Sequence, residues 1–133
     1  YLVKDIAVGL PDLAVDPDRM GQVLGNLLDN AAKYSPDGGR TAVRVSAGRT
    51  DVSIAVADEG VGIPPADLPH VFDSFYRARR GDRVAPGTGL GLAIARGMVT
   101  AMDGTITAIS PRPDLPRDGQ PGTVLTLVLP AAP

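Results

Sequence analysis

Two carboxamide side chains and one ammonium group recur at helical spacing early in the sequence. If this stretch forms a helix at ~100° per residue, Asn26, Asn30 and Lys33 fall within about 60° of one another. The residues on the far side are all apolar, namely Leu24, Leu27, Leu28 and Ala31. Asparagine oxygens are neutral ligands that suit a Mg²⁺ ion held mainly by phosphates and water, and lysine is a point charge for phosphate. Most polar helix faces are only solvated, so the pattern alone favours a solvated face over a phosphate site.

A carboxylate stands at the end of a predicted strand. Asp58 follows an alternating run and precedes Gly60 and Gly62, so it would lie at a sheet edge beside backbone that a planar ligand can approach. A carboxylate only accepts hydrogen bonds, which suits an exocyclic amine such as that of adenine. The alternative is an aspartate that merely forms the turn, and the segment alone favours that interpretation.

A glycine-rich segment enters a predicted helix at residues 87–92, which read GTGLGL. Unblocked backbone N–H groups and the positive helix end can bind phosphate there. A hinge that lets the helix pack closely is an equally good interpretation. The segment is not a P-loop, because no Gly-Lys-Ser/Thr follows, and the parallel strand that a dinucleotide-binding loop requires is missing.

Most aromatic residues of the chain lie within residues 72–77, which read FDSFYR. Phe72 and Phe75 are expected to anchor the core. The arginines that follow, from Arg77 through residues 79–83, form either a solvated loop or a lid over phosphate. His70 is expected to be a partly exposed helix residue.

The hydrophobic pattern predicts the elements that position these groups. Asp16 as N-cap and Pro17 at the first helical position begin a helix that runs to about Ser35. After a turn at residues 36–39, two antiparallel strands are expected, joined near residues 48–51. The other elements are an entry strand before residue 15, short helices within 65–78, a polar loop at 79–87, a helix at 90–102, strands at 105–109 and 124–129, and a proline-rich loop at 111–122.

The second long helix is expected to present Leu90, Ile94, Met98 and Ala101 on one side and to end at Gly104 as its C′ residue. Taken together, the elements predict an α/β two-layer sandwich, with a mostly antiparallel sheet covered by helices on one face.

Composition narrows the class of protein. With 133 residues, 44% hydrophobic and 21% charged, residues 1–133 are expected to form a single domain. A net charge of -2 gives no general attraction for nucleic acid. The absence of cysteine excludes disulfides and thiolate metal sites, and one histidine cannot build a histidine-rich metal centre. No apolar run approaches the ~20 residues of a membrane span. Because the chain starts at Tyr1, we expect it to be excised from a longer protein.

Four segments in fixed order resemble the catalytic and ATP-binding domain of sensor histidine kinases, within the GHKL superfamily. They are NLLDNAAKYSP (an N box), DEGVGIP (a G1 box), FDSFYR (an F box) and GTGLGLAIA (a G2 box). Each box is weak alone, whereas their joint order and spacing are specific. The resemblance implies a Bergerat-type fold and the binding of ATP with Mg²⁺.

The resemblance also implies roles for individual residues. Asn30 matches the Mg²⁺-ligating asparagine and Asn26 its partner one turn earlier, which itself is a possible metal ligand. Lys33 matches a phosphate-contacting position, and Tyr34 matches the residue that packs on adenine. Together with Arg77, a basic residue near the phosphates, Asn26, Asn30 and Lys33 form the implied catalytic set.

The remaining implied contacts concern the base and the phosphates. Asp58 matches the carboxylate that reads adenine, with Thr123 assisting through water. The other implied nucleotide-binding positions are Gly60, Gly62 and Ile63 at the pocket, and Gly87, Thr88, Gly89, Leu90, Gly91 and Leu92 beneath the lid.

The implied function is donation of the γ-phosphoryl group of ATP to a histidine on a separate dimerisation domain, in two-component signal transduction. Expected partners are that domain and a cognate response regulator, with no nucleic acid, and the fragment is expected to be a monomeric cytoplasmic part of an inner-membrane sensor. Alternatives are a hydrolytic GHKL ATPase, an anti-sigma-factor kinase, or a non-catalytic nucleotide-binding or protein-interaction module. Asn26 stands where the hydrolases place a glutamate, and an amide is no general base. The intact F box separates the chain from the anti-sigma-factor type.

Overall fold

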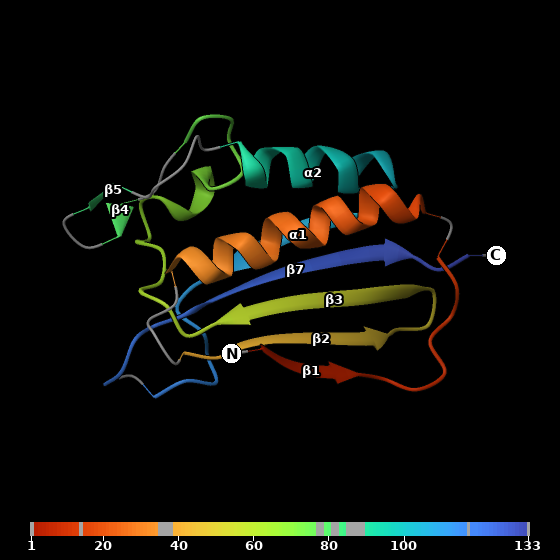
Figure 1. The fold of residues 1–133 in the computed structure, drawn as a ribbon, viewed down its shortest axis with the longest axis horizontal. Coiled ribbons are helices and arrows are strands. Elements are labelled where there is room, and N and C mark those ends of the chain that lie inside the picture. Colours follow the sequence, from red (N-terminus) through yellow and green to blue (C-terminus); the bar gives the residue numbers. More distant parts are fainter. Residues whose placement is uncertain are drawn as a thin grey trace.

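Both long helices lie on one face of a five-stranded sheet (Figure 1). The computed structural model describes residues 2–13, 15–34, 39–76, 79–80, 83–84, 90–116 and 118–132. In the strand order β1-β2-β3-β7-β6, β1 runs parallel to β2 and the other neighbouring pairs are antiparallel. The expected two-layer sandwich is confirmed. Its strands are β1 (Leu2–Ile6), β2 (Thr41–Ala47), β3 (Asp51–Asp58), β6 (Thr105–Ile109) and β7 (Thr123–Pro130).

Helix α1 (Pro17–Tyr34) begins where the sequence predicts. Asp16 is its N-cap, because Asp16 Oδ1 accepts a hydrogen bond of 2.9 Å from the N–H of Asp18. Pro17 takes the first helical position, where no intrahelical N–H is needed. The face that packs on the sheet is formed by the buried residues Met20, Val23, Leu27 and Ala31.

Helix α2 (Gly91–Ala101) does not bury the predicted row of apolar residues as a whole. Of that row, Met98 packs against the core, but Ile94 and Ala101 are exposed, whereas Ala95 and Val99 are fully buried. The helix is apolar almost all round, so its sequence has no polar stripe to fix its rotation. Packing against α1 and the sheet decides instead which residues face inward.

The end of α2 also differs from the prediction. Asp103 takes the left-handed conformation (φ 61°) that was expected of Gly104, which a short polar side chain tolerates. Gly104 is needed for another reason: a Cβ there would lie 2.6 Å from the carbonyl oxygen of Val128 and 2.6 Å from Leu129 Cδ2. The glycine therefore lets the chain pass closely over β7.

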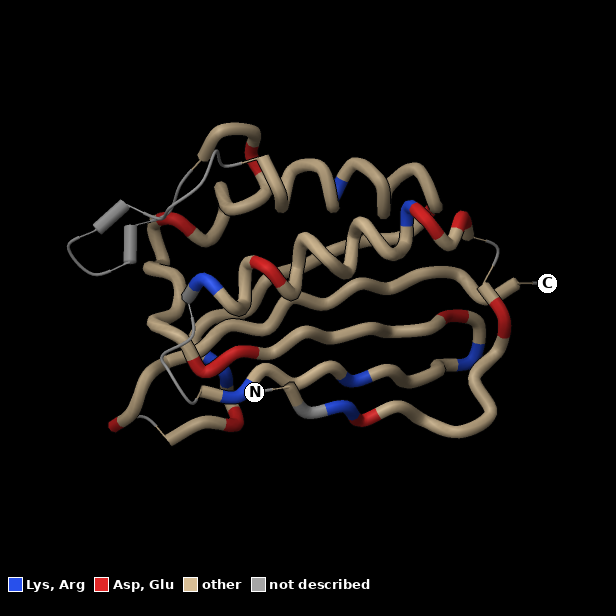
Figure 2. The backbone as a smooth tube through the Cα atoms, in the orientation of Figure 1, with Lys and Arg blue, Asp and Glu red and all other residues tan. Residues whose placement is uncertain are grey.

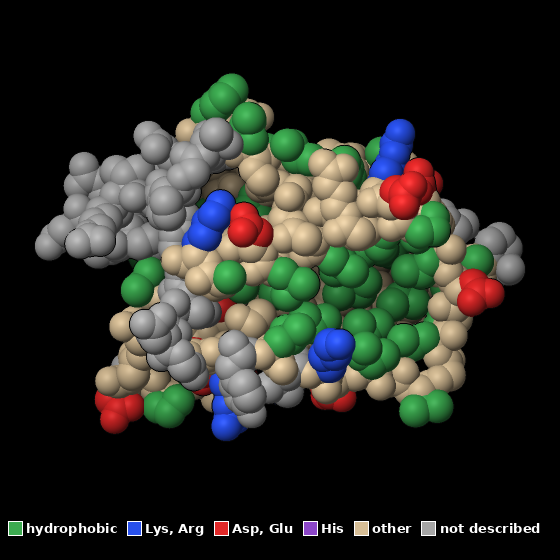
Figure 3. Space-filling view, in the orientation of Figure 1, with side chains coloured by type: hydrophobic (Ala, Val, Ile, Leu, Met, Phe, Trp, Pro, Cys, Tyr) green, Lys and Arg blue, Asp and Glu red, His purple; other side chains and the backbone are tan. Residues whose placement is uncertain are grey.

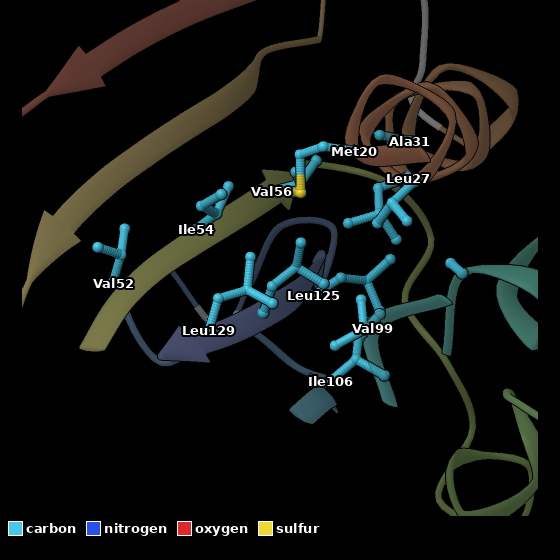
Figure 4. Close-up of a cluster of buried hydrophobic side chains, with 13 residues drawn as sticks. Met20, Leu27, Ala31, Val52, Ile54, Val56, Val99, Ile106, Leu125 and Leu129 are labelled. Carbon is cyan, nitrogen blue, oxygen red and sulfur yellow. The ribbon is translucent and has the colours of Figure 1, made fainter. Parts of the chain in front are cut away.

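Side chains from α1 and α2 point toward those of β3 and β7 in the core (Figure 4). On the surface, hydrophobic side chains also gather between α1 and the outer strands β1 and β2 (Figure 3), where Leu24, Leu28, Val43 and Val45 are only partly buried. The helices thus cover β3 and β7 most completely, so packing holds these two strands firmly.

Between β3 and α2, the described residues 59–76 form mostly turns and bends. One 3₁₀ turn, η1 (Leu68–His70), lies where short helices were expected, and His70 is exposed as predicted. Two short strands, β4 (Arg79–Arg80) and β5 (Arg83–Val84), pair antiparallel within the expected polar loop.

Phe72 is partly buried and packs against the core, but Phe75 is 70% exposed, which corrects the prediction that both anchor it. The backbone of Phe75 is left-handed (φ 64°), so the chain changes direction at this residue and Phe75 does not follow Phe72 into the core.

Two glycine-to-alanine variants test these packing distinctions. Gly21 lies on the exposed side of α1, and a Cβ added there would meet no atom within 4 Å. Gly21→Ala is therefore expected to stabilise the fold by about 0.5–1 kcal/mol, because alanine has the higher helix propensity. Gly104→Ala is expected to destabilise it by roughly 1–3 kcal/mol through overpacking. Urea unfolding of each variant measures both changes, and a stabilising Gly104→Ala would contradict the close approach described.

Candidate functional site

Four chain segments meet at one end of the sheet (Figure 1). They are the last turns of α1, the end of β3, the start of β7 and the start of α2. This convergence brings together side chains that are far apart in the sequence. We call this end of the molecule the candidate site.

Asp58 and Thr123 form the base of the candidate site. They are direct partners in the β3–β7 register, so their side chains share the face of the sheet that carries the helices. Both are buried, Asp58 at 2% and Thr123 at 1% exposure. Among the described residues, no hydrogen-bond partner reaches Thr123 Oγ1. A buried hydroxyl without a hydrogen-bond partner costs about 1–3 kcal/mol of folding free energy. A water or a ligand is therefore expected to form a hydrogen bond with this oxygen.

Asp58 ends β3 and Glu59 follows it, so two acidic residues lie at this end of the strand (Figure 2). The N–H of Gly60 donates to Asp58 Oδ1 at 2.9 Å. Gly62 has a left-handed backbone (φ 76°), and a Cβ there would lie 2.6 Å from Pro121 Cγ. Ile63, the next residue, is 5% exposed. The hydrogen bond from Gly60 therefore fixes the carboxylate, and the close packing of Pro121 against Gly62 fixes the turn that follows it.

The loop before β7 closes onto the same turn. Ser110 Oγ accepts from the N–H of Ile63 at 2.9 Å and donates to the carbonyl of Gly122 at 2.8 Å. The N–H of Gly122 in turn donates to the carbonyl of Gly60 at 2.9 Å. Ser110 therefore bridges the turn after β3 and the residue that precedes Thr123.

Arg112 lies within this junction with only 8% of its side chain exposed. Its Nη1 donates to the carbonyl oxygen of Asp58 at 3.1 Å. Nε and Nη2 donate to the two carboxylate oxygens of Asp114 at 3.0 and 2.6 Å. These hydrogen bonds lower the pKa of Asp114 and raise the pKa of Arg112.

The polar face of α1 forms the upper wall of the candidate site. Asn26 Nδ2 donates to the carbonyl of Gly91 at 3.2 Å and so joins α1 to the first residue of α2. Lys33 forms a 3.0 Å ion pair with Asp29 one turn back. Asn30 is half-buried between them on the same face.

Several predicted positions lie outside the described residues, namely Arg77, Gly87, Thr88, Gly89 and the side chain of Tyr34. Leu90 directly precedes α2, and Leu92 packs against the core. The described positions that come together are thus Asn26, Asn30, Lys33, Asp58, Gly60, Gly62, Ile63, Gly91 and Thr123.

A polar cluster follows the candidate site on the segment before β4. Tyr76 donates its hydroxyl hydrogen bond to Asp67 Oδ1, which raises the pKa of Tyr76. His70 Nδ1 lies 3.1 Å from Asp73 Oδ2, and its ring centroid is 5.3 Å from that of Tyr76. These contacts join residues within the segment 67–76 and stabilise its conformation.

Sequence reasoning missed Ser110, Arg112 and Asp114. All three lie in or beside the proline-rich loop, which gave no periodic signal. The spacing of Arg112 and Asp114 fits a local ion pair, but the contact of Arg112 with Asp58 spans 54 positions. Only the fold brings them together.

The chain belongs to the family of histidine kinase-, DNA gyrase B- and HSP90-like ATPases, which matches residues 15–133. Its sandwich is accordingly of the Bergerat type, as in the catalytic domains of histidine kinases. In the part of the chain that the structure describes, no helix is both long and apolar enough to span a membrane.

Individual relatives are sensor kinases by name. Sensor histidine kinase WalK of Bacillus subtilis is 43% identical over 128 residues, which cover 91% of this chain and 20% of the relative. The solved structure of a mycobacterial sensor histidine kinase, MprB, superposes with a TM-score of 0.85 at 34% identity, covering 99% of this chain and 85% of that one. Full-length ShkA, solved in complex with AMPPNP, has a TM-score of 0.77 at 25% identity, covering 100% of this chain and 26% of that one. The chain therefore spans about a fifth of the Bacillus relative.

The Arg112–Asp114 pair makes stability depend on pH. The folded-state pKa of Asp114 lies below its unfolded value, so its contribution is present above the unfolded pKa and is lost as pH falls through the folded pKa. Because Asp114 is half exposed, Asp114→Asn is expected to cost only about 0.5–1 kcal/mol at pH 7. Urea unfolding at pH 7 and pH 3 measures the difference between the two proteins, which should shrink at pH 3. A pH-independent difference would contradict the ion pair.

Proposed function

We propose that this chain binds ATP with Mg²⁺ at the candidate site and holds it for transfer of the γ-phosphoryl group to a protein histidine. The observation that carries the proposal is the buried Asp58 carboxylate opposite a Thr123 hydroxyl that no described residue satisfies. A fixed acceptor beside an unsatisfied hydroxyl suits an adenine edge, which offers an exocyclic amine and ring nitrogen acceptors. Family membership and the nucleotide analogue bound to ShkA support the same ligand.

The donor set fits the proposed ligand at both ends. Gly60 donates its N–H to the Asp58 carboxylate and adds no side chain beside it, so it does not obstruct a flat base. Asn30 and Lys33 lie on the polar face of α1 toward the same end of the sheet, where an amide oxygen suits Mg²⁺ and an ammonium suits phosphate. The ion supplies charge neutralisation between phosphate oxygens when it is bound.

In this proposal the chain acts by positioning and electrostatics, as is general for phosphoryl transfer. Asp58 and Thr123 orient the base. Lys33, which pairs with Asp29, also binds phosphate. Asn26 holds the start of α2 through its hydrogen bond to the carbonyl of Gly91. Asn26 carries no basic oxygen, so it cannot activate water as a glutamate would. Transfer to a histidine is therefore favoured over hydrolysis.

The names of the relatives, which are sensor histidine kinases, support a proposed acceptor domain and signalling partner. The histidine that receives the phosphoryl group lies on a dimerisation domain in a longer parent, of which residues 1–133 form the single ATP-binding domain. The parent then passes the group to a response regulator in two-component signalling. We further propose a cytoplasmic position for this domain and a membrane location for the parent.

Base recognition is tested by Asp58→Asn. Because Asp58 Oδ1 accepts from Gly60 N–H, an asparagine that keeps this bond places its NH₂ donor where the carboxylate offered an acceptor. ATP affinity should fall by about tenfold or more, while GTP, whose base has a carbonyl at that position, should lose less. Calorimetric titration with Mg²⁺ measures both. Asp103→Asn, beyond the far end of α2, is the matched control, and its affinity for ATP should equal that of wild type. Unchanged ATP affinity in Asp58→Asn would refute the adenine pocket.

Phosphoryl transfer is tested in the presence of the dimerisation domain of the parent. Wild type with labelled ATP should form an acid-labile phosphohistidine on that domain, and Asn30→Ala should reduce the rate by roughly 100-fold or more, since a lost transition-state contact acts on rate directly. Free phosphate release by the isolated chain should remain slow. If a folded pair binds ATP and forms no phosphohistidine, the chain is a nucleotide-binding module instead.

A further inference from the structure

The position of Asp58 is fixed from outside its own strand. Arg112, on the loop between β6 and β7, donates through Nη1 to the carbonyl oxygen of Asp58, 54 positions earlier in the chain. That carbonyl belongs to the last residue of β3, where the ladder with β7 ends. The contact therefore acts on the backbone that carries the carboxylate.

Arg112 is itself held on several sides. Asp114 accepts hydrogen bonds from Nε and Nη2, which is the bidentate geometry that a guanidinium forms with a carboxylate. The backbone N–H of Arg112 donates to the carbonyl of Pro121 at 2.8 Å. With 8% of its side chain exposed, Arg112 has little freedom to move, so it can hold Asp58 rigidly.

The surrounding space leaves little room for rearrangement. A Cβ at Gly122, whose φ is 70°, would lie 2.5 Å from the carbonyl oxygen of Asp58 and 2.8 Å from Arg112 Cδ. Ser110 ties Gly122 to the turn after Asp58 through Ile63. Arg112 and Gly122 therefore pack together against the backbone carbonyl of Asp58, on the residue that carries the carboxylate.

We infer that Arg112 is a positioning residue for nucleotide recognition, which fixes the Asp58 carboxylate through its backbone and so sets the preference for adenine. This inference rests on the proposed ATP site. Arg112 does not touch the base: it acts through Asp58. Its loss should weaken selection of the base rather than binding of the phosphates, because Asn30 and Lys33 stand on a different element, α1.

The test compares nucleotides as well as variants. ATP and GTP, each with Mg²⁺, are titrated calorimetrically into wild type, Arg112→Gln, Arg112→Lys and the control Arg19→Gln. Arg19, at the start of α1, is 63% exposed and pairs only loosely with Asp16 at 3.9 Å, so the control makes the same charge change far from the junction. Thermal unfolding of every protein is measured in parallel.

Arg112→Gln is expected to lower ATP affinity by about tenfold, as expected for the loss of a charge-assisted hydrogen bond, and to leave GTP affinity nearly unchanged. The ATP affinity of Arg112→Lys should lie between those of wild type and Arg112→Gln, since one ammonium cannot bind both Asp114 and the carbonyl of Asp58. Arg19→Gln should match wild type. A fall in the ratio of ATP to GTP affinity is the signature of positioning.

Two results would overturn the inference. One is wild-type ATP affinity in Arg112→Gln; the other is an equal loss for ATP and GTP, which would mark a merely structural role. If Arg112→Gln does not fold, the same ratio measured for Arg112→Lys and Asp114→Asn decides the matter. Failure of the proposed function looks different, because then wild type itself binds no ATP.

Discussion

In the register of β3 and β7, the last residue of one strand lies opposite the first residue of the other, and these residues are Asp58 and Thr123. Both side chains are buried beneath the helix layer. The remaining features of the candidate site depend on this pairing, because the glycine turn begins where β3 ends and the proline-rich loop returns where β7 begins. A slip of one residue would turn either side chain to the opposite face of the sheet.

The hydrophobic core keeps that register in place. Leu125, Leu127 and Leu129 of β7 lie under the helices together with Val52, Ile54 and Val56 of β3, and all six are buried. Their alternation continues to Asp58 and Thr123, so the two polar side chains occupy positions that belong to the core by periodicity. Burial of a carboxylate is unfavourable without partners, and the N–H of Gly60 supplies one. The core thus places a polar pair where an apolar pair would be expected.

The elements that stabilise the fold also carry the groups of the candidate site. The packing of α1 and α2 on β3 and β7 stabilises the fold, while the last turns of α1, the end of β3 and the start of β7 hold the groups that would meet a ligand. Asn26 connects the two helices, since its side chain joins α1 to the first residue of α2. Arg112 makes the corresponding connection between the proline-rich loop and β3. Rigid elements with their polar groups at one end are the arrangement that preorganised binding requires.

The alternating strands, the start of α1 at Asp16 and Pro17, and the polar row of Asn26, Asn30 and Lys33 can all be predicted from the amino-acid sequence, and four ordered motifs indicate the family. The strands, the helix start and the polar row are local signals, because period and capping act within one or two turns or strands, whereas the family follows from the joint order of the motifs along the chain. Packing of the whole fold is needed to explain which face α2 buries, why Phe75 points outward, and why Asp103 rather than Gly104 takes the left-handed conformation after α2. The same holds for the junction of Ser110, Arg112 and Asp58, because residues separated by about fifty positions meet only when β3, β6 and β7 lie side by side. A sequence pattern specifies each strand, but the packing of the whole sheet specifies what lies behind the carboxylate.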